Sequence, residues 1–242
     1  MFSYFYETEK NEMSVIQTPD ARLLSAVPYI KQGGRVADIG TDHAYLPIYL
    51  VNEGIADSAI AADINLGPIL SARANIEAAG FSDRIETIQT DGLHGIETKA
   101  PDDILIFGMG GELIIRILQE APWVRDARIG LILQPMSRIS LLRQWLCENG
   151  FSIRDEALTD ATRFYQTIYA RYDGKGEKYT EEELLLGKRN IEKNPPLFAD
   201  FVRHEIAVHQ KILDGKKRSS DCDVSGELRT IEFLKKRLES IT

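Results

Sequence analysis

The 242-residue sequence contains only two cysteines, Cys147 and Cys222, which stand far apart in the chain. This scarcity excludes a disulfide-stapled scaffold and a zinc ribbon, so we expect a reduced, cytoplasmic protein without a metal site. No apolar run approaches the ~18 residues of a membrane-spanning helix, so no membrane contact is expected. The opening residues, MFSYFYETEKNEMS, lack the basic segment and apolar run of a secretory signal.

An excess of positive charge is also missing, because the net charge is −8. Residues 1–173 carry 15 basic against 24 acidic side chains, whereas residues 174–242 carry 14 against 13. The overall field would repel a polyanion such as nucleic acid. Binding of RNA would therefore need local basic clusters, and the candidates are Lys216-Lys217-Arg218 and Lys235-Lys236-Arg237. The alternative is that these clusters are a solvated loop and a solvated helix face.

Short apolar runs alternate with helical segments over the first part of the chain. After residues 1–18, which we expect to be a flexible extension, apolar residues at helical spacing predict a helix over 19–30. Five strands are predicted after it, separated by segments such as the helices 67–80 and 112–121. This alternation indicates βαβ units and a parallel sheet covered on both faces. The predicted strands are residues 35–40, 58–64, 85–91, 103–108 and 129–134.

The pattern changes after the fifth strand. A helix over 141–150 precedes two strand-like segments, 151–158 and 164–172, and the residues between these segments are too few for a parallel crossover. They therefore predict an antiparallel hairpin. Five parallel strands followed by such a hairpin resemble the Rossmann-like sheet of class I, S-adenosylmethionine-dependent methyltransferases. We assign residues 19–173 to this domain.

Residues 174–242 are expected to form a separate helical domain. Thr180 and Glu183 have capping-box spacing at the start of a helix over 181–193, which Pro195-Pro196 interrupts. Apolar residues then repeat at helical spacing from Phe198 to Leu213 and from Leu228 to Ile241. Two such helices joined by a polar turn predict an antiparallel, coiled-coil-like helical hairpin. It would either cover the sheet or grip an elongated partner.

The strongest chemical signal is Asp38-Ile39-Gly40-Thr41-Asp42-His43, directly after the first strand. Ligands bind at the carboxyl ends of strands in open α/β sheets, and a glycine there lets the backbone turn close to a ligand. No further glycines follow Gly40 in the pattern that cradles a pyrophosphate, which argues against a dinucleotide. Two carboxylates suit a ligand with an amine and a sulfonium. The alternative is an ordinary strand–helix turn with a capping aspartate.

Three more turns carry polar residues or glycines at the same edge. Asp63 ends the second strand, at a spacing typical of the acid that accepts both ribose hydroxyls. Asp91-Gly92 follows the third strand, where an acid could accept from an adenine amino group. The segment 108–111, Gly-Met-Gly-Gly, leaves bare backbone after the fourth strand. Each could be ordinary turn chemistry by itself.

Six segments together resemble the bacterial tRNA (adenine(22)-N(1))-methyltransferase family, TrmK. They are ADIGTDHAYLP (37–47), AADINLGP (61–68), DGL (91–93), GMGGELI (108–114), LQPM (133–136) and FYQTIYA (164–170). The resemblance implies S-adenosylmethionine as cofactor, tRNA as substrate and a coiled-coil-like C-terminal domain. The family lacks the Asn/Asp-Pro-Pro-aromatic signature of other adenine N-methyltransferases, so their mechanism is not transferred here.

The resemblance also assigns individual residues. Asp42 falls on the position proposed as catalytic. Asp38, Gly40, His43, Asp63, Asp91 and Gly108 fall on cofactor positions, and we add Ile64, Asn65, Gly92 and Met109 beside them as expected cofactor-binding residues. Apart from the resemblance, the expected substrate-binding residues are Tyr45, Gln134, Pro135, Lys216, Lys217 and Arg218.

The predicted function is thus methylation of N1 of a tRNA adenine, position 22 by resemblance, by a monomer or weak homodimer. Asp42 would accept from the exocyclic amine, Tyr45 would stack on the base and Gln134 would contact its edge. An extruded base is required because N1 lies on the Watson–Crick edge. The alternatives are a small-molecule methyltransferase, a non-catalytic RNA-binding protein that retains a cofactor pocket, and an NAD-dependent oxidoreductase.

Overall fold

The computed structural model describes residues 18–218 and 223–242. The predicted N-terminal extension, apart from Thr18, lies outside the described residues, as does part of the polar turn before the last helix. In the described part of the chain, no helix is both long enough and apolar enough to cross a membrane.

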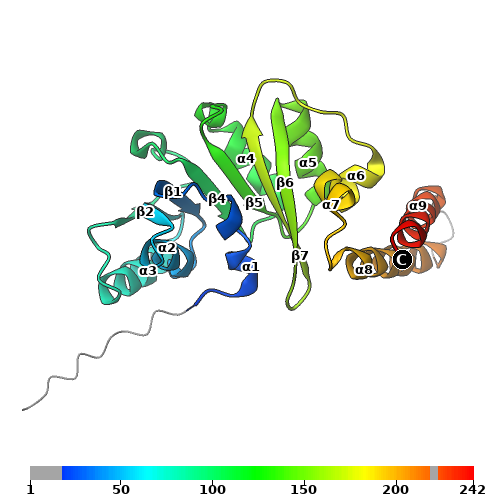
Figure 1. The fold of residues 1–242 in the computed structure, drawn as a ribbon, viewed down its shortest axis with the longest axis horizontal. Coiled ribbons are helices and arrows are strands. Elements are labelled where there is room, and N and C mark those ends of the chain that lie inside the picture. The colour runs from blue at the N-terminus through cyan, green and yellow to red at the C-terminus, as the bar shows by residue number, and fades with distance from the viewer. Residues whose placement is uncertain (1–17, 219–222) are drawn as a thin grey trace, which may run out of the picture.

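Within residues 18–218, seven strands form one sheet in the order β3-β2-β1-β4-β5-β7-β6 (Figure 1). The first five strands pair in parallel, and β7 lies antiparallel between β5 and β6. The predicted parallel sheet with a terminal hairpin is confirmed. The strands are β1 Gly34–Ile39, β2 Ala56–Asp63, β3 Ile85–Gln89, β4 Asp103–Phe107, β5 Gly130–Gln134, β6 Phe151–Asp160 and β7 Phe164–Tyr172.

Helices cover both faces of this sheet. In β4, Ile104 and Ile106 pack with α4 and α5, whereas Leu105 packs with α2 and the segment after α1. Side chains that alternate between two apolar layers explain why the strand is apolar throughout. The α-helices and short 3-10 helices (η) before β6 are α1 Ala21–Leu24, η1 Val27–Tyr29, α2 Tyr45–Asn52, α3 Leu66–Ala78, η2 Glu97–Lys99, α4 Gly111–Gln119, η3 Pro122–Val124 and α5 Ile139–Glu148.

The single helix predicted over residues 19–30 is wrong. The structure has the four-residue α1 and the 3-10 turn η1 in its place. Pro28 has no amide hydrogen, so it cannot donate the α-helical hydrogen bond to the carbonyl of Leu24. The chain forms the tighter 3-10 turn instead. Asp20 caps α1 by accepting from the Leu23 amide at 2.9 Å.

The C-terminal segment comprises α6 Glu181–Leu186, α7 Lys188–Lys193, α8 Phe198–Lys217 and α9 Ser225–Ile241. The Thr180–Glu183 capping box is present, but the helix predicted over 181–193 divides into α6 and α7 at Gly187. Helices α8 and α9 pack through Phe201, Val202 and Leu234, as the predicted helical hairpin requires. Leu228, at 48 % exposure, does not join this core.

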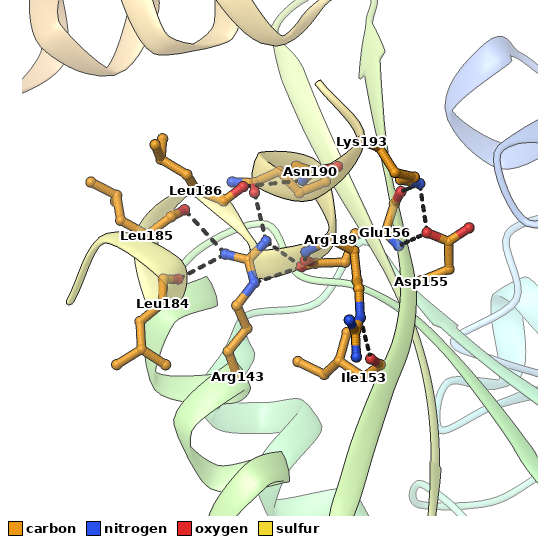
Figure 2. Close-up of polar contacts among 11 residues, drawn as sticks. Arg143, Ile153, Asp155, Glu156, Leu184, Leu185, Leu186, Arg189, Asn190 and Lys193 are labelled. Carbon is orange, nitrogen blue, oxygen red and sulfur yellow. Dashed lines mark hydrogen bonds and ion pairs between the residues drawn. The ribbon is translucent and has the colours of Figure 1, made fainter. Parts of the chain in front are cut away.

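A buried ion pair joins the helical segment to the sheet (Figure 2). Arg143 of α5 donates to Glu156 of β6 at 2.7 Å, and both side chains are fully buried. Arg143 also donates to the carbonyl of Leu184 at 2.8 Å, while Glu156 accepts from the Arg189 amide at 3.0 Å. Two charges held away from water need such partners, so α6 and α7 cannot leave the sheet without a large penalty.

Gly187 is the position where this junction tolerates no side chain. Its φ of +88° is unfavourable for other residues, and a Cβ there would lie 2.6 Å from Glu156 Oε2 and 2.8 Å from Arg143 Nη2. We expect Gly187→Ala to lower the free energy of unfolding by about 2–4 kcal/mol, measured by urea denaturation. Gly215→Ala in α8 is the control, because its Cβ meets open space; it should stabilise by up to about 1 kcal/mol. Equal effects of the two substitutions would contradict the role given to Gly187.

Candidate active site

The turn after β1 lies where the strand order reverses, between β1 and β4. Gly40 adopts φ +77°, and its amide and that of Thr41 both donate to the carbonyl of Ala62 in β2, at 2.8 and 2.9 Å. A Cβ on Gly40 would lie 2.3 Å from Cε of Met109, which follows β4. The left-handed backbone conformation favours glycine here, and a side chain would also have to displace the end of Met109.

The next residues hold a strained conformation. His43 and Ala44 both have positive φ, +58° and +57°, although neither is glycine. The carbonyl of His43 accepts from Asn75 Nδ2 of α3 at 2.9 Å, which fixes the bend before α2. The Asp42 side chain is 85 % exposed, and its Oδ1 lies 3.2 Å from His43 Nε2. Backbone strain kept at a ligand-facing turn is a sign of a functional constraint.

Two adjoining cavities open at this edge of the sheet. The larger, of about 510 Å³, is lined by the segment Thr18–Leu23 and by the ends of β1, β2 and β4. The smaller, of about 150 Å³, extends toward β3 and α4. Gly40, Asp63 and Met109 line both, so they form one cleft with two lobes.

The larger lobe contains the predicted acidic residues. Asp38, Asp42 and Asp63 all line it. Burial raises the pKa of Asp38 to about 6; the charges of Asp42 and Asp63 add to this effect, and the Thr41 hydroxyl and Arg22 oppose it. A buried carboxylate that is costly to ionise favours a ligand that brings a positive charge.

The smaller lobe combines apolar and polar walls. Ile64 and Leu113 line it and are exposed by 55 % and 39 %, so a flat apolar ligand could cover them. Asp91 also lines it and is held by Arg116, whose Nη2 and Nη1 donate to its two oxygens at 3.0 and 3.3 Å. Hydrogen bonds from Arg116 lower the pKa of Asp91, so the carboxylate stays ionised.

The remaining predicted cofactor residues lie around the same cleft. Gly92 lines the smaller lobe and Gly108 the larger. Asn65 directly precedes α3, and its backbone N–H donates to Asp63 Oδ1 at 2.7 Å, which orients that carboxylate. His43 lies beside the cleft and stacks on Tyr45 with ring centroids 5.4 Å apart. Tyr45 lines the larger lobe and is half-buried.

Gln134 has a structural position that its sequence motif did not reveal. Its side chain is fully buried, and Nε2 donates to Thr167 Oγ1 at 3.0 Å and to the Arg22 carbonyl at 3.1 Å. These bonds fasten α1 to β7 and leave no exposed amide for a base. Pro135 is buried next to it. In this arrangement neither residue offers the substrate contact that the sequence predicted.

Arg22 is a cleft residue that the sequence analysis missed. Among the described residues, it is the one Lys or Arg that lines the larger lobe. Its Nη1 donates to Gln134 Oε1 at 3.3 Å, and its guanidinium lies 5.7 Å from the ring centre of Tyr165. The periodicity of residues 19–30 indicated only a helix, so nothing in the sequence showed this side chain turning to the ends of β4 and β5.

The basic cluster is not part of the cleft. Lys216 and Lys217 end α8, and the helical hairpin lies at the opposite end of the molecule from α2 and α3 (Figure 1). Lys216 pairs with Glu227 at 3.1 Å, whereas Lys217 and Arg218 are exposed. A ligand that contacts both the cluster and the cleft must therefore be an extended one.

Comparison with known proteins agrees with this geometry. The family model of the methyltransferase domain matches residues 20–168. A tRNA (adenine(22)-N(1))-methyltransferase of Bacillus subtilis is 36% identical over 167 residues, 69% of this chain and 70% of that protein.

Solved structures extend the similarity to the helical segment. A Streptococcus pneumoniae protein in complex with S-adenosyl-L-methionine is 32% identical with a TM-score of 0.80, covering 90% of this chain and 99% of the other. TrmK of M. capricolum in complex with S-adenosyl-homocysteine is 26% identical with a TM-score of 0.77, covering 93% and 100%. On the family model and the B. subtilis relative together, the chain belongs to the tRNA (adenine(22)-N(1))-methyltransferase family.

Proposed function

We propose that this protein transfers a methyl group from S-adenosylmethionine to N1 of an adenine in tRNA, at position 22 as in the names of its relatives. The observation that carries the proposal is the acid-lined cleft beside Gly40, at the point where the strand order reverses. As its oligomeric state, we propose a monomer or weak homodimer. A tRNA substrate would place the protein in the cytoplasm.

The residues of the cleft fit this cofactor. Asp38 and Arg22 present opposite charges in the larger lobe, which suits the ammonium and carboxylate of an amino acid. Asp63 can accept from two ribose hydroxyls, and Ile64, Leu113 and Asp91 suit the two faces and the amino group of an adenine. Gly40 lines both lobes, so its backbone, which carries no side chain, can face the bound ligand. When bound, S-adenosylmethionine supplies an electrophilic methyl group on a sulfonium.

Asp42 is the proposed catalytic residue. Adenine N1 is an unprotonated nitrogen with a free lone pair, so no base needs to remove a proton before transfer. The methylated base carries a positive charge, which a nearby carboxylate stabilises as it develops. The exposed Asp42 side chain at the rim of the cleft can accept from the exocyclic amine and hold N1 inward. Tyr45 beside it offers a ring to the extruded base.

We expect Asp42→Ala to lose methylation by roughly 100-fold or more while binding S-adenosylmethionine with near wild-type affinity. Calorimetry measures the binding, and methyl incorporation into unmodified tRNA measures turnover. Asp83→Ala removes an exposed carboxylate away from the cleft and should change neither quantity. Wild-type turnover in Asp42→Ala would remove this residue from the mechanism.

Cofactor affinity should depend on pH through Asp38, whose raised pKa lies at about 6. Below this pH the carboxyl is neutral, so the ammonium of the cofactor must displace a proton on binding. Calorimetry should therefore show an affinity near its maximum at about pH 7, where Asp38 is ionised and the cofactor amine is still protonated, and a fall of about tenfold per pH unit below the pKa of Asp38. Asp38→Asn should bind more weakly at neutral pH and lose this dependence. The same pH dependence in Asp38→Asn would assign it to another group.

The exposed end of α8 should bind tRNA phosphates. Lys217→Glu combined with Arg218→Glu should weaken tRNA binding roughly tenfold and flatten its dependence on salt, without changing cofactor affinity. Filter binding over a salt series measures this. Lys175→Glu with Lys178→Glu makes the same charge change in the linker before α6 and serves as the control. Equal losses in both pairs would indicate a general charge effect rather than a contact at α8.

A further inference from the structure

The turn between β6 and β7 lies between the cleft and the helical hairpin. Adjacent residues of a strand point to opposite sides. Accordingly Phe164 packs on Phe201 and His204 of α8, with ring centroids 5.7 and 5.4 Å away. Tyr165 points the other way, and the guanidinium of Arg22, which lines the cleft, lies 5.7 Å from its ring centre. In Figure 1 this turn lies between α1 and α8. An RNA that reaches from the helical hairpin to the cleft would pass this turn.

Arg163 occupies this turn and is exposed. Its guanidinium lies 5.1 Å from the ring centre of Tyr165, and Nη2 contacts the carbonyl oxygen and Sδ of Met136 at 3.3 and 3.0 Å. The Met136 amide in turn donates to the carbonyl of Met109, a wall residue of the cleft, at 2.8 Å. Tyr165 and Met136 thus hold the arginine head at the edge of the cleft.

Arg163 carries a charge that the described part of the chain does not neutralise. Among residues 18–218 and 223–242, no carboxylate forms an ion pair with it, although this part of the chain is rich in acidic residues. A guanidinium held by a ring, a carbonyl and a sulfur keeps donors free for an anion from outside. Phosphate is the anion that arginine recognises most readily in RNA.

We propose that Arg163 contacts a tRNA phosphate beside the extruded adenine, with Tyr165 and Met136 as its positioning residues. This contact rests on the proposed function. The contact lies on the side of the cleft that faces the helical hairpin. It therefore completes a path from that hairpin to the target base. A phosphate contact carries no sequence information, so it serves every tRNA substrate equally.

The test compares Arg163→Gln with wild type in the full-length protein, using an unmodified tRNA transcript. Filter binding measures tRNA affinity over a salt series, steady-state methylation gives KM for tRNA and kcat, and calorimetry gives cofactor affinity. We expect KM for tRNA to rise about tenfold, kcat and cofactor affinity to stay near wild type, and the salt slope of binding to fall by about one. Arg163→Lys should recover most of the loss.

Two further variants separate the contact from general charge and from folding. Arg125→Gln removes another exposed arginine that has no ion pair in the described chain. Arg125 precedes β5 and so lies near the amino-terminal end of this strand, away from the cleft. The substitution should leave KM and the salt slope unchanged. Tyr165→Leu should raise KM about threefold because it removes the ring under the guanidinium, and Tyr165→Phe should not.

The proposal is overturned if Arg163→Gln matches wild type in tRNA binding, KM and salt slope, or if it weakens cofactor binding instead. A protein that binds tRNA but does not methylate it would refute the proposed function. The binding measurement would still decide the role of Arg163, so the two failures are distinguishable.

Discussion

The buried pair of Arg143 and Glu156 is the interaction on which the position of α6 and α7 against the sheet depends. Both charges are withdrawn from water, and their further hydrogen-bond partners include backbone groups of α6 and α7 and the Gln166 side chain of β7. Such a pair contributes little net stability, but leaving either charge alone would cost about 3–5 kcal/mol. The pair therefore favours the position of α6 and α7 in which both charges keep their partners, while α8 also packs on the β6–β7 hairpin through Phe164 and Phe201.

Charge is separated along the molecule in a way that matches two different ligands. Aspartates gather inside the cleft, where a cofactor with a positive sulfonium and ammonium would bind. Cations without an ion pair among the described residues stand outside it, at Arg163 and at the exposed end of α8. Under the proposed function, the acidic lining would repel a polyanion from the interior, and Arg163 and the end of α8 would contact it outside the cleft. The acidic interior suits an uncharged base but not the anionic phosphate backbone of the RNA.

Much of this fold followed from the sequence, because apolar runs and turn residues are local signals. The strand–turn motifs at Gly40, Asp63 and Gly108 were predicted at one edge, since parallel strands bring their carboxyl ends together. The predictions failed where distant contacts decide. Gly187 divides a helix because the chain passes Glu156, and periodicity cannot register a neighbour so far away in the sequence.

Polar side chains were harder still to interpret. An amide such as Gln134 looks the same in sequence whether it contacts a base or fastens two elements of the fold. Here its partners are Arg22 and Thr167, neither of them near it in the chain. Arg22 and Arg163 carried no local signal either, because their positions at the cleft result from the packing of α1 and the β6–β7 hairpin.

The opposite orientations of Phe164 and Tyr165 also limit how this chain can change in length during evolution. Ile168 of β7 pairs with Leu133 of β5. Inserting or deleting one residue between Tyr165 and Ile168 would therefore turn the side chains of Phe164 and Tyr165 to the opposite faces of the sheet. Length changes in this hairpin should therefore be confined to the turn before Phe164, or occur in twos within the strand. Keeping the number of inserted or deleted strand residues even thus preserves the link between the helical hairpin and the cleft.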